Sequence, residues 1–144
     1  MKIRLSVGAF VIDKNGKFLL VKTRGEGETY WDIPKGGVEG RESLIEALKR
    51  ELREELGTNK FEEIKKLNLN FIFEFPEEVK QKVGFESQKV ELFLVHFNGN
   101  EKDIKVDKKE ILDFEFVDKD TFIRKVSYET TRKAFIKMLK KLNF

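Results

Sequence analysis

A helical pattern whose two ends are both marked constrains the fold of this chain more than any other feature. Its apolar residues recur on one helical stripe: Ile45, Leu48, Leu52 and Leu56. Ser43 and Glu46 match a capping box, in which each side chain bonds the backbone N–H of the other residue. Gly57 stands where a left-handed residue commonly ends a helix. The sequence therefore predicts a helix over residues 43–56 that packs one face against a core.

Strand patterns flank this helix on both sides. Residues 3–12 are rich in β-branched side chains and residues 18–22 are apolar, and an Asn-Gly turn at 15–16 joins them as a predicted hairpin. Apolar and polar residues alternate over 67–75 up to Pro76, which predicts a half-buried strand. Elements of the same kinds are expected further on: strands at 89–97 and 111–117, and an amphipathic helix at 128–142.

The remaining segments lack such patterns. Residues 23–30 place two glycines among charged side chains and are expected to form a mobile polar loop. Residues 31–37 are expected to form a short rigid segment that ends in glycines, and residues 79–87 a charged connection. The order of strands and helices predicts one mixed α/β domain over residues 1–144.

Composition excludes several kinds of site and partner. The 144 residues include no Cys and one His, so disulfides, thiolate sites and multi-histidine zinc sites are excluded, and any metal must be bound mainly by oxygen. The net charge of +3, with both signs interspersed, gives only a weak attraction to polyanions, and no DNA partner is expected. No apolar run approaches the roughly 18 residues of a membrane helix, and no cleavage site follows the basic start. We expect a cytoplasmic monomer or homodimer without membrane contact.

Three acidic side chains of the predicted helix lie on one side of it. Glu51 and Glu55 share a face, and Glu54 lies about 60° further round. Like charges at this spacing destabilise a helix by a few tenths of a kcal/mol per pair. Mg²⁺ takes oxygen ligands and is usually held by carboxylates together with substrate phosphates. The cluster is what a divalent-cation site requires, although residues 50–56 taken alone are more typical of a solvated helix face.

The spacing upstream of this cluster favours the cation site. Gly36 is followed six residues later by Glu42, and eight residues after that by Arg50 and Glu51. The pattern then continues through Leu52, Glu54, Glu55 and Gly57. In this register the chain resembles the signature of the Nudix hydrolases, which implies the fold of that family, an α/β/α sandwich with a mixed β-sheet. Thr58 departs from the signature, because the family usually has an aliphatic residue there, but its methyl group fills part of that space.

The resemblance implies a metal-dependent activity on nucleotides. Glu51, Glu54 and Glu55 would be ligands of Mg²⁺ or Mn²⁺, together with the backbone carbonyl of Lys35. The implied reaction is hydrolysis of a nucleoside diphosphate linked to another group. The ions would neutralise charge on the phosphates and lower the pKa of a bound water, and a glutamate would accept the proton of the attacking water.

The other matched residues would support this site. Arg50 would orient a catalytic glutamate by a charge-assisted hydrogen bond, and Glu42 would brace the loop or reach a metal through water. Gly36 and Gly37 would let the loop pack closely on the helix. Glu110 is a candidate for a second-site base or metal ligand, with an ordinary surface glutamate as the alternative.

The residues that precede the signature bear on the substrate. Residues 31–39 include Pro-Lys-Gly and resemble a subset that contains diadenosine tetraphosphate hydrolases and some RNA 5′ pyrophosphohydrolases, as do residues 88–94 and 110–117. Lys35 adds positive charge beside a long polyphosphate. We therefore expect asymmetrical cleavage of diadenosine tetraphosphate to ATP and AMP. The subset more often has glycine directly before Glu42, where this chain has Arg41, so the resemblance leaves the shape of the loop open.

Other activities and contacts stay open. The alternative substrates are RNA 5′ ends, (d)NTPs and ADP-ribose, and the alternative of another class is a non-catalytic module that binds nucleotides. Candidate contacts to phosphate are the basic residues Lys22, Arg24, Lys35 and Lys89. Candidates for stacking on a base are Tyr30, Phe85 and Tyr128. Taken singly, each of these side chains apart from Lys35 is better explained as an ordinary core or surface residue.

Overall fold

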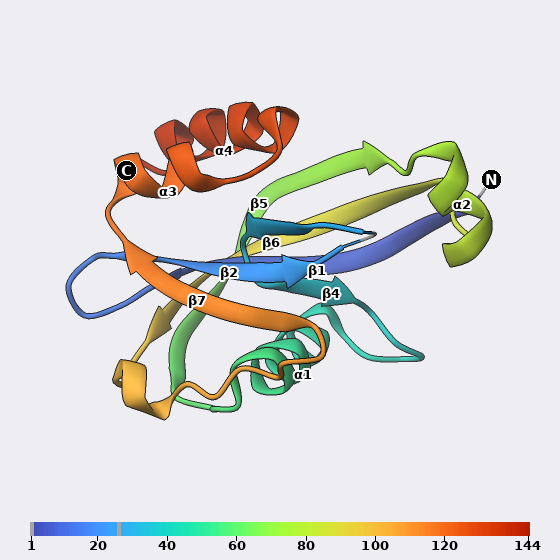
Figure 1. The fold of residues 1–144 in the computed structure, drawn as a ribbon. Coiled ribbons are helices and arrows are strands. Elements are labelled where there is room, and N and C mark those ends of the chain that lie inside the picture. Colours follow the sequence, from blue (N-terminus) through green and yellow to red (C-terminus); the bar gives the residue numbers. More distant parts are fainter. Residues whose placement is uncertain (1, 26) are drawn as a thin grey trace.

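The computed structural model describes residues 2–25 and 27–144, and its central element is a mixed seven-stranded sheet (Figure 1). The strands are β1 Ile3–Ile12, β2 Phe18–Arg24, β3 Thr29–Asp32, β4 Lys35–Gly37, β5 Phe61–Glu74, β6 Ser87–Phe97 and β7 Ile111–Val117. The helices are α1 Leu44–Leu56, α2 Glu77–Val83, α3 Lys119–Lys125 and α4 Glu129–Lys141, with a 3₁₀ turn η1 at Glu101–Asp103. The strand order is β3-β2-β1-β6-β5, while β4 pairs with β1 and β7 with β2.

Strand β1 is the centre of the sandwich because both of its faces are buried. Its odd-numbered side chains, such as Val7 and Val11, belong to the same apolar cluster as Leu48 of α1. Its even-numbered side chain Phe10 packs on the opposite side against Phe135 of α4, with ring centroids 5.2 Å apart. Helix α1 therefore covers one face of the sheet, and α3 and α4 cover the other (Figure 1). The expected α/β/α sandwich with a mixed sheet is confirmed.

The pairing of β1 brings distant segments together. It runs parallel to β6, from Ile3 opposite Ser87 to Ile12 opposite His96, and it pairs antiparallel with β2 and with β4. Its edge away from β6 is shared by β2, which meets it only at Ile12, and by β4, which lies opposite residues 6–8. Because α1 follows β4 closely in the chain, the helix starts beside the middle of the central strand. This arrangement positions the candidate site.

Most expected elements occur at or near their expected bounds. The predicted helix at 43–56 is α1 with Ser43 as its N-cap, the predicted strands at 3–12 and 111–117 are β1 and β7, and the predicted final helix is α4. The expected Asn-Gly turn is present, with a φ of 73° at Gly16. Strand β5 starts six residues before the predicted strand at 67–75, because irregular pairing at two points interrupts the alternation in its first half.

Two expected connections are instead regular structure. The predicted mobile loop at 23–30 is mostly hairpin, because β2 continues to Arg24 and β3 begins at Thr29; residue 26 lies outside the described residues. The predicted connection at 79–87 begins with the end of α2, which Pro76 precedes and Gly84 ends in a left-handed conformation with φ of 76°. In the described part of the chain, no helix is long and apolar enough to cross a membrane.

Candidate active site

Helix α1 carries the acidic cluster and has firmly defined ends. The Ser43 hydroxyl accepts from the Glu46 backbone N–H at 3.2 Å, and the Glu46 carboxylate accepts from the Ser43 N–H at 3.0 Å. At the other end Gly57 has a φ of 66°, and its N–H donates to the Arg53 carbonyl at 2.9 Å. A side chain at Gly57 would also approach the Lys105 carbonyl oxygen to 2.5 Å. The acidic residues are therefore held at fixed positions along a helix that cannot easily shift along its axis.

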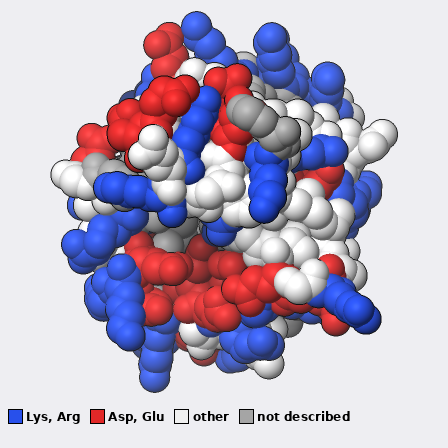
Figure 2. All heavy atoms as spheres, turned by 90° about the vertical axis from the view of Figure 1, so that its right-hand side faces the viewer, with Lys and Arg blue, Asp and Glu red and all other residues white. Residues whose placement is uncertain are grey.

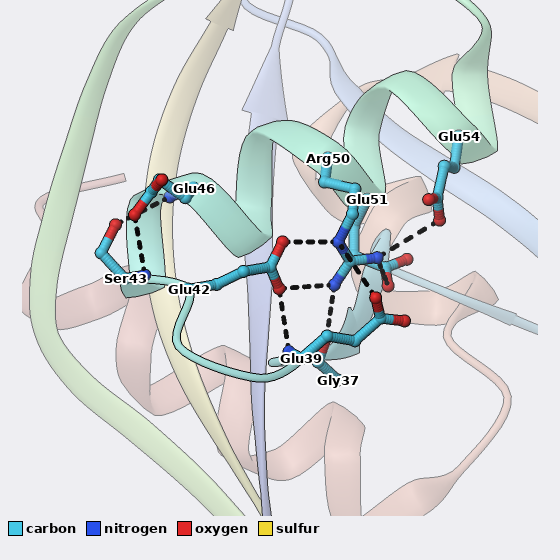
Figure 3. A network of polar contacts seen from close by, with 8 residues as sticks. All are labelled: Gly37, Glu39, Glu42, Ser43, Glu46, Arg50, Glu51 and Glu54. Carbon is cyan, nitrogen blue, oxygen red and sulfur yellow. Dashed lines mark hydrogen bonds and ion pairs between the residues drawn. The ribbon is translucent and has the colours of Figure 1, made fainter.

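Arg50 is the centre of a network that joins this helix to the preceding loop (Figure 3). Its Nε donates to Glu42 Oε2 at 2.7 Å and its Nη2 to Glu42 Oε1 at 2.9 Å, a bidentate pair. Nη2 also donates to the Gly37 carbonyl at 2.8 Å. Nη1 donates to Glu51 at 2.9 Å and to Glu54 at 3.3 Å. Arg50 thus orients Glu51, and of the two roles expected for Glu42 the observed contacts correspond to bracing the loop.

The network makes a prediction for stability at low pH. Hydrogen bonds from Arg50, and one from the Glu39 N–H at 2.8 Å, lower the pKa of Glu42 from 4.5 to about 2. A depressed carboxylate pKa stabilises the fold above pH 4.5, and this contribution is lost as the pH falls towards about 2. Glu42→Gln should therefore lower the thermal unfolding midpoint at pH 7. In this variant the midpoint should also fall less steeply than in the parent protein as the pH decreases from 4.5 to about 2.

Thermal unfolding followed by circular dichroism across this pH range checks the prediction. The matched control is Glu39→Gln, because the Glu39 carboxylate is 74% exposed and lies 3.8 Å from Arg50 Nε. In this control, the unfolding midpoint should fall with decreasing pH as steeply as it does in the parent protein. An equally steep decline in Glu42→Gln would show that the Glu42–Arg50 pair does not carry the acid sensitivity.

Strand β4 brings backbone groups up to the acidic side chains. A Cβ at Gly36 would overlap the Glu51 carboxylate, so this position accommodates that side chain only as glycine. On the β1 side, Ala9 N–H donates to the Pro34 carbonyl at 3.2 Å and Val38 N–H to that of Leu5 at 3.0 Å. Because backbone groups alternate in direction along a strand, the Lys35 carbonyl points away from β1. It lies on the same edge of β4 as the Gly37 carbonyl, on the side of α1, and its role as a metal ligand stays a prediction.

Glu55 is the buried carboxylate of the site. Glu55 is only 5% exposed, and its Oε2 atom has no hydrogen-bond partner among residues 2–25 and 27–144. Burial, followed by the negative charges of Glu51 and Glu110, raises the pKa of Glu55 well above 4.5, although the Lys35 backbone N–H bonds the carboxylate. Burial also raises the pKa of Glu51, against the effect of Arg50. An orphaned carboxylate oxygen beside other acids fits a divalent cation, which would offset much of their negative charge.

Glu54 does not converge with the other two acids, which corrects the expectation from helical angles. Its side chain is 58% exposed, and its carboxylate is turned to Arg50, one helical turn away. Among the residues that the structure describes, no three acidic or histidine side chains stand close enough together to hold a metal ion. Glu54 stands apart from Glu51 and Glu55 because its carboxylate is paired with the Arg50 guanidinium at 3.3 Å. Glu51 and Glu55 line the cleft, and Glu54 would have to turn to join them.

The acids lie in a cleft of about 1080 Å³. Its acidic side is lined by Glu51, Glu55 and Glu110. The hairpin of β2 and β3 and the start of α4 form a second side, and the end of β5 with α2 forms a third. Figure 2 shows acidic side chains gathered across the lower middle of one face, with Lys and Arg around them. A polyanion can therefore be held near the acids only if cations, from solution or from the rim, balance the charge.

The structure places some of the expected substrate contacts in this cleft and others outside it. Those that line it are Arg24, Tyr30, Lys35, Gly36, Tyr128 and Glu110. The Lys35 ammonium is paired with Asp32 at 3.0 Å and lies 5.0 Å from the centre of the Phe73 ring. Lys22, Lys89 and Phe85 are not among the described residues that line the cleft, and Lys89 is paired with Glu91 at 3.3 Å. The proposed substrate contacts of these three residues therefore stay predictions that the shape of the cleft does not support.

Arg4 is a cleft residue that sequence reasoning missed. It lines the cleft, and a Cβ at Gly37 would lie 2.6 Å from its Nη2 atom, so the guanidinium packs directly on β4. None of the ion pairs found in the described part of the chain involves it. Opposite Arg4 on β6 is Gln88, which is 5% exposed and also lines the cleft. A guanidinium without a carboxylate partner is suited to bind phosphate.

An aromatic wall, formed by the end of β5 and the residue after it, was also not recognised as part of the site. Phe71, Phe73 and Phe75 line the cleft, and successive ring centroids are 5.6 Å apart. Their alternation in the sequence indicates one face of a strand, but only the pairing of β5 with β6 shows that this face borders the cleft. Half-buried aromatic rings beside acids and cations are suited to bind the bases or ribose of a nucleotide.

Comparisons with known proteins agree with this geometry. The model of the NUDIX domain matches residues 2–139. The fold and the arrangement of acids on α1 thus define a protein of the Nudix class, and the chain belongs to the Nudix hydrolase family.

The more particular resemblances are to one curated relative and to two solved structures. An RNA pyrophosphohydrolase from Wolbachia pipientis wMel is 37% identical over 108 residues, which are 73% of this chain. The match spans 66% of that protein, just under two thirds of its length. A C. elegans Ap4A hydrolase complex has a TM-score of 0.72 at 21% identity, covering 98% of each chain. The E. coli dihydroneopterin triphosphate pyrophosphohydrolase has a TM-score of 0.76 at 16% identity, covering 97% of this chain and 99% of its own.

Proposed function

We propose that this protein is a metal-dependent pyrophosphohydrolase that removes phosphates from the 5′ end of RNA. The observation that carries the proposal is the cleft, in which a buried, orphaned carboxylate of Glu55 lies beside Glu51 and faces Glu110. Such a group of acids is unfavourable when no cation is bound, because each raises the free energy of the others' ionised forms. It has a purpose when Mg²⁺ or Mn²⁺ ions and phosphates share the cleft.

Different residues of this chain would have different roles in such a hydrolysis. Glu51, Glu55 and, after turning, Glu54 would hold the metal with the Lys35 carbonyl, and Glu110 faces them from the loop before β7. The metal would supply charge neutralisation and an acidified water. Arg50 keeps Glu51 in place, and a glutamate of this group accepts the proton of the attacking water. Attack occurs at phosphorus, so no covalent intermediate with the protein is required.

The choice of RNA over diadenosine tetraphosphate rests on the relatives and on the shape of the cleft. The curated relative from Wolbachia and one from Nitratiruptor, 32% identical over 127 residues, are both named RNA pyrophosphohydrolase. The similarity to the Ap4A hydrolase is more distant and supports the fold alone. The cleft is open and has aromatic groups on two sides, which suits a chain of several nucleotides. The expected preference for diadenosine tetraphosphate therefore becomes the second candidate.

A substrate comparison tests this choice. We expect kcat/KM in Mg²⁺ or Mn²⁺ to be at least about tenfold higher for a short RNA with a 5′-triphosphate or 5′-diphosphate than for diadenosine tetraphosphate, dGTP or ADP-ribose. The product should be RNA with a 5′-monophosphate, resolved by electrophoresis of end-labelled RNA. RNA that already carries a 5′-monophosphate is the negative control. Preferential release of ATP and AMP from diadenosine tetraphosphate would instead establish the second candidate.

A further inference from the structure

Tyr30 is held in the cleft in a way that does not suit a stacking platform. Its ring lies against Tyr128 with centroids 5.3 Å apart, and a Cβ at Gly25 would be 3.0 Å from its Cε1 atom. Its neighbour Trp31 is fixed to the turn before α4, because the Trp31 N–H donates to the Ser127 hydroxyl at 2.8 Å and the Ser127 N–H to the Trp31 carbonyl at 3.1 Å. The ring is therefore confined on two sides, which leaves little room for a base against it.

The hydroxyl of Tyr30 is the part of this side chain that is available. In the described part of the chain it makes no hydrogen bond, although the residue lines the same cleft as Glu51 and Glu55. Burial, followed by the charges of Asp32, Glu55 and Glu110, raises the pKa of Tyr30 to about 12. The phenol is therefore protonated throughout the physiological range, and it can donate a hydrogen bond to an anion.

Two cationic side chains close to the acids already have partners. The Arg50 guanidinium donates to Glu42, Glu51 and the Gly37 carbonyl. The Lys35 ammonium is paired with the buried Asp32 carboxylate at 3.0 Å. The Tyr30 hydroxyl, unlike these two cations, can therefore donate to a phosphate on this side of the cleft without giving up an existing bond.

We propose that the Tyr30 hydroxyl donates a hydrogen bond to a non-bridging phosphate oxygen of the substrate bound beside Glu55 and Glu110. The inference depends on the proposed function only in requiring a polyphosphate in the cleft. It assigns Tyr30 to the phosphates, whereas Tyr128, which is 46% exposed, remains the candidate for the base on this side. A hydrogen bond to a charged oxygen is among the stronger ones in proteins, so its loss should be measurable.

Tyr30→Phe tests this assignment because it removes the hydroxyl and keeps the ring between Gly25 and Tyr128. We expect the inhibition constant of inorganic tripolyphosphate in Mg²⁺ to rise about tenfold, with a similar fall in kcat/KM for 5′-triphosphate RNA and an unchanged unfolding temperature. The matched control is Thr29→Val, which removes a hydroxyl from the adjacent exposed residue of β3, outside the cleft lining. It should change both values less than twofold.

A double-mutant cycle with Gly25→Ala sharpens the test. The added methyl group has to move the Tyr30 ring, so Gly25→Ala should weaken tripolyphosphate binding in the parent but add little in the Tyr30→Phe background. Equal inhibition constants for Tyr30→Phe and the parent would overturn the inference, even if RNA is hydrolysed. A rise in the inhibition constant in a protein that does not hydrolyse RNA would support the inference while the proposed function fails.

Discussion

Replacement of Glu55 by Gln is expected to lower turnover about 10³-fold while leaving the fold intact. Glu55 is the most buried of the three acids, and none of the residues that the structure describes donates a hydrogen bond to its Oε2 atom. An amide fills the same space, but it carries no negative charge with which to hold a cation. Because a buried neutral group is easier to accommodate than a buried charge, the metal-free variant should be at least as stable as the metal-free parent.

Activity, metal affinity and stability together check this expectation. Calorimetric titration with Mn²⁺ should show weaker binding to Glu55→Gln, and thermal unfolding in EDTA should show no loss of stability. The matched control is Glu46→Gln on the same helix, because glutamine also completes a capping box with Ser43. This control should retain full activity. Activity of Glu55→Gln close to that of the parent would remove Glu55 from the site and leave the acidic cluster without its buried member.

The sequence was most informative where local chemistry determines the structure. The ends of α1 are fixed by Ser43 with Glu46 and by Gly57, and each of these contacts spans only a few residues. The position of Gly36 relative to Glu51 could also be predicted, because the signature specifies a residue without a side chain at that distance from the helix. The general form of the site therefore followed from spacing along the chain.

The expectations that changed depend on contacts between distant segments. Helical angles place Glu54 about 60° from Glu51, but they do not reveal that Arg50 takes up its carboxylate. Arg4 resembles any basic residue near a terminus until β4 and β6 pair with β1 and place it in the cleft. The prediction of the substrate changed for the same reason. The sequence Pro-Lys-Gly is compatible with two kinds of polyphosphate substrate, and the walls of the cleft come from the distant elements β5, α2 and α4.

Gly36→Ala is the substitution outside the acids with the largest expected effect. The backbone of this residue is an ordinary strand, so alanine causes no conformational strain, and β4 should still form. Its methyl group would overlap the Glu51 carboxylate, which must then leave its place beside Glu55 and give up its bond from Arg50. We expect kcat to fall about 10²-fold and the Mn²⁺ concentration for half-maximal activity to rise, as a titration of activity against Mn²⁺ would show.

Gly37→Ala provides the matched comparison, because the next residue of the same strand faces a different partner. Its methyl group would meet the Arg4 Nη2 atom at 2.6 Å, the far end of a flexible side chain that can move aside. That change should raise KM for 5′-triphosphate RNA and leave the Mn²⁺ requirement unaltered, because Arg4 would bind phosphate and not metal. Two neighbouring glycines would then separate metal binding from phosphate binding. If both variants shifted the Mn²⁺ requirement equally, Gly36 would act through the general shape of the loop and not through Glu51.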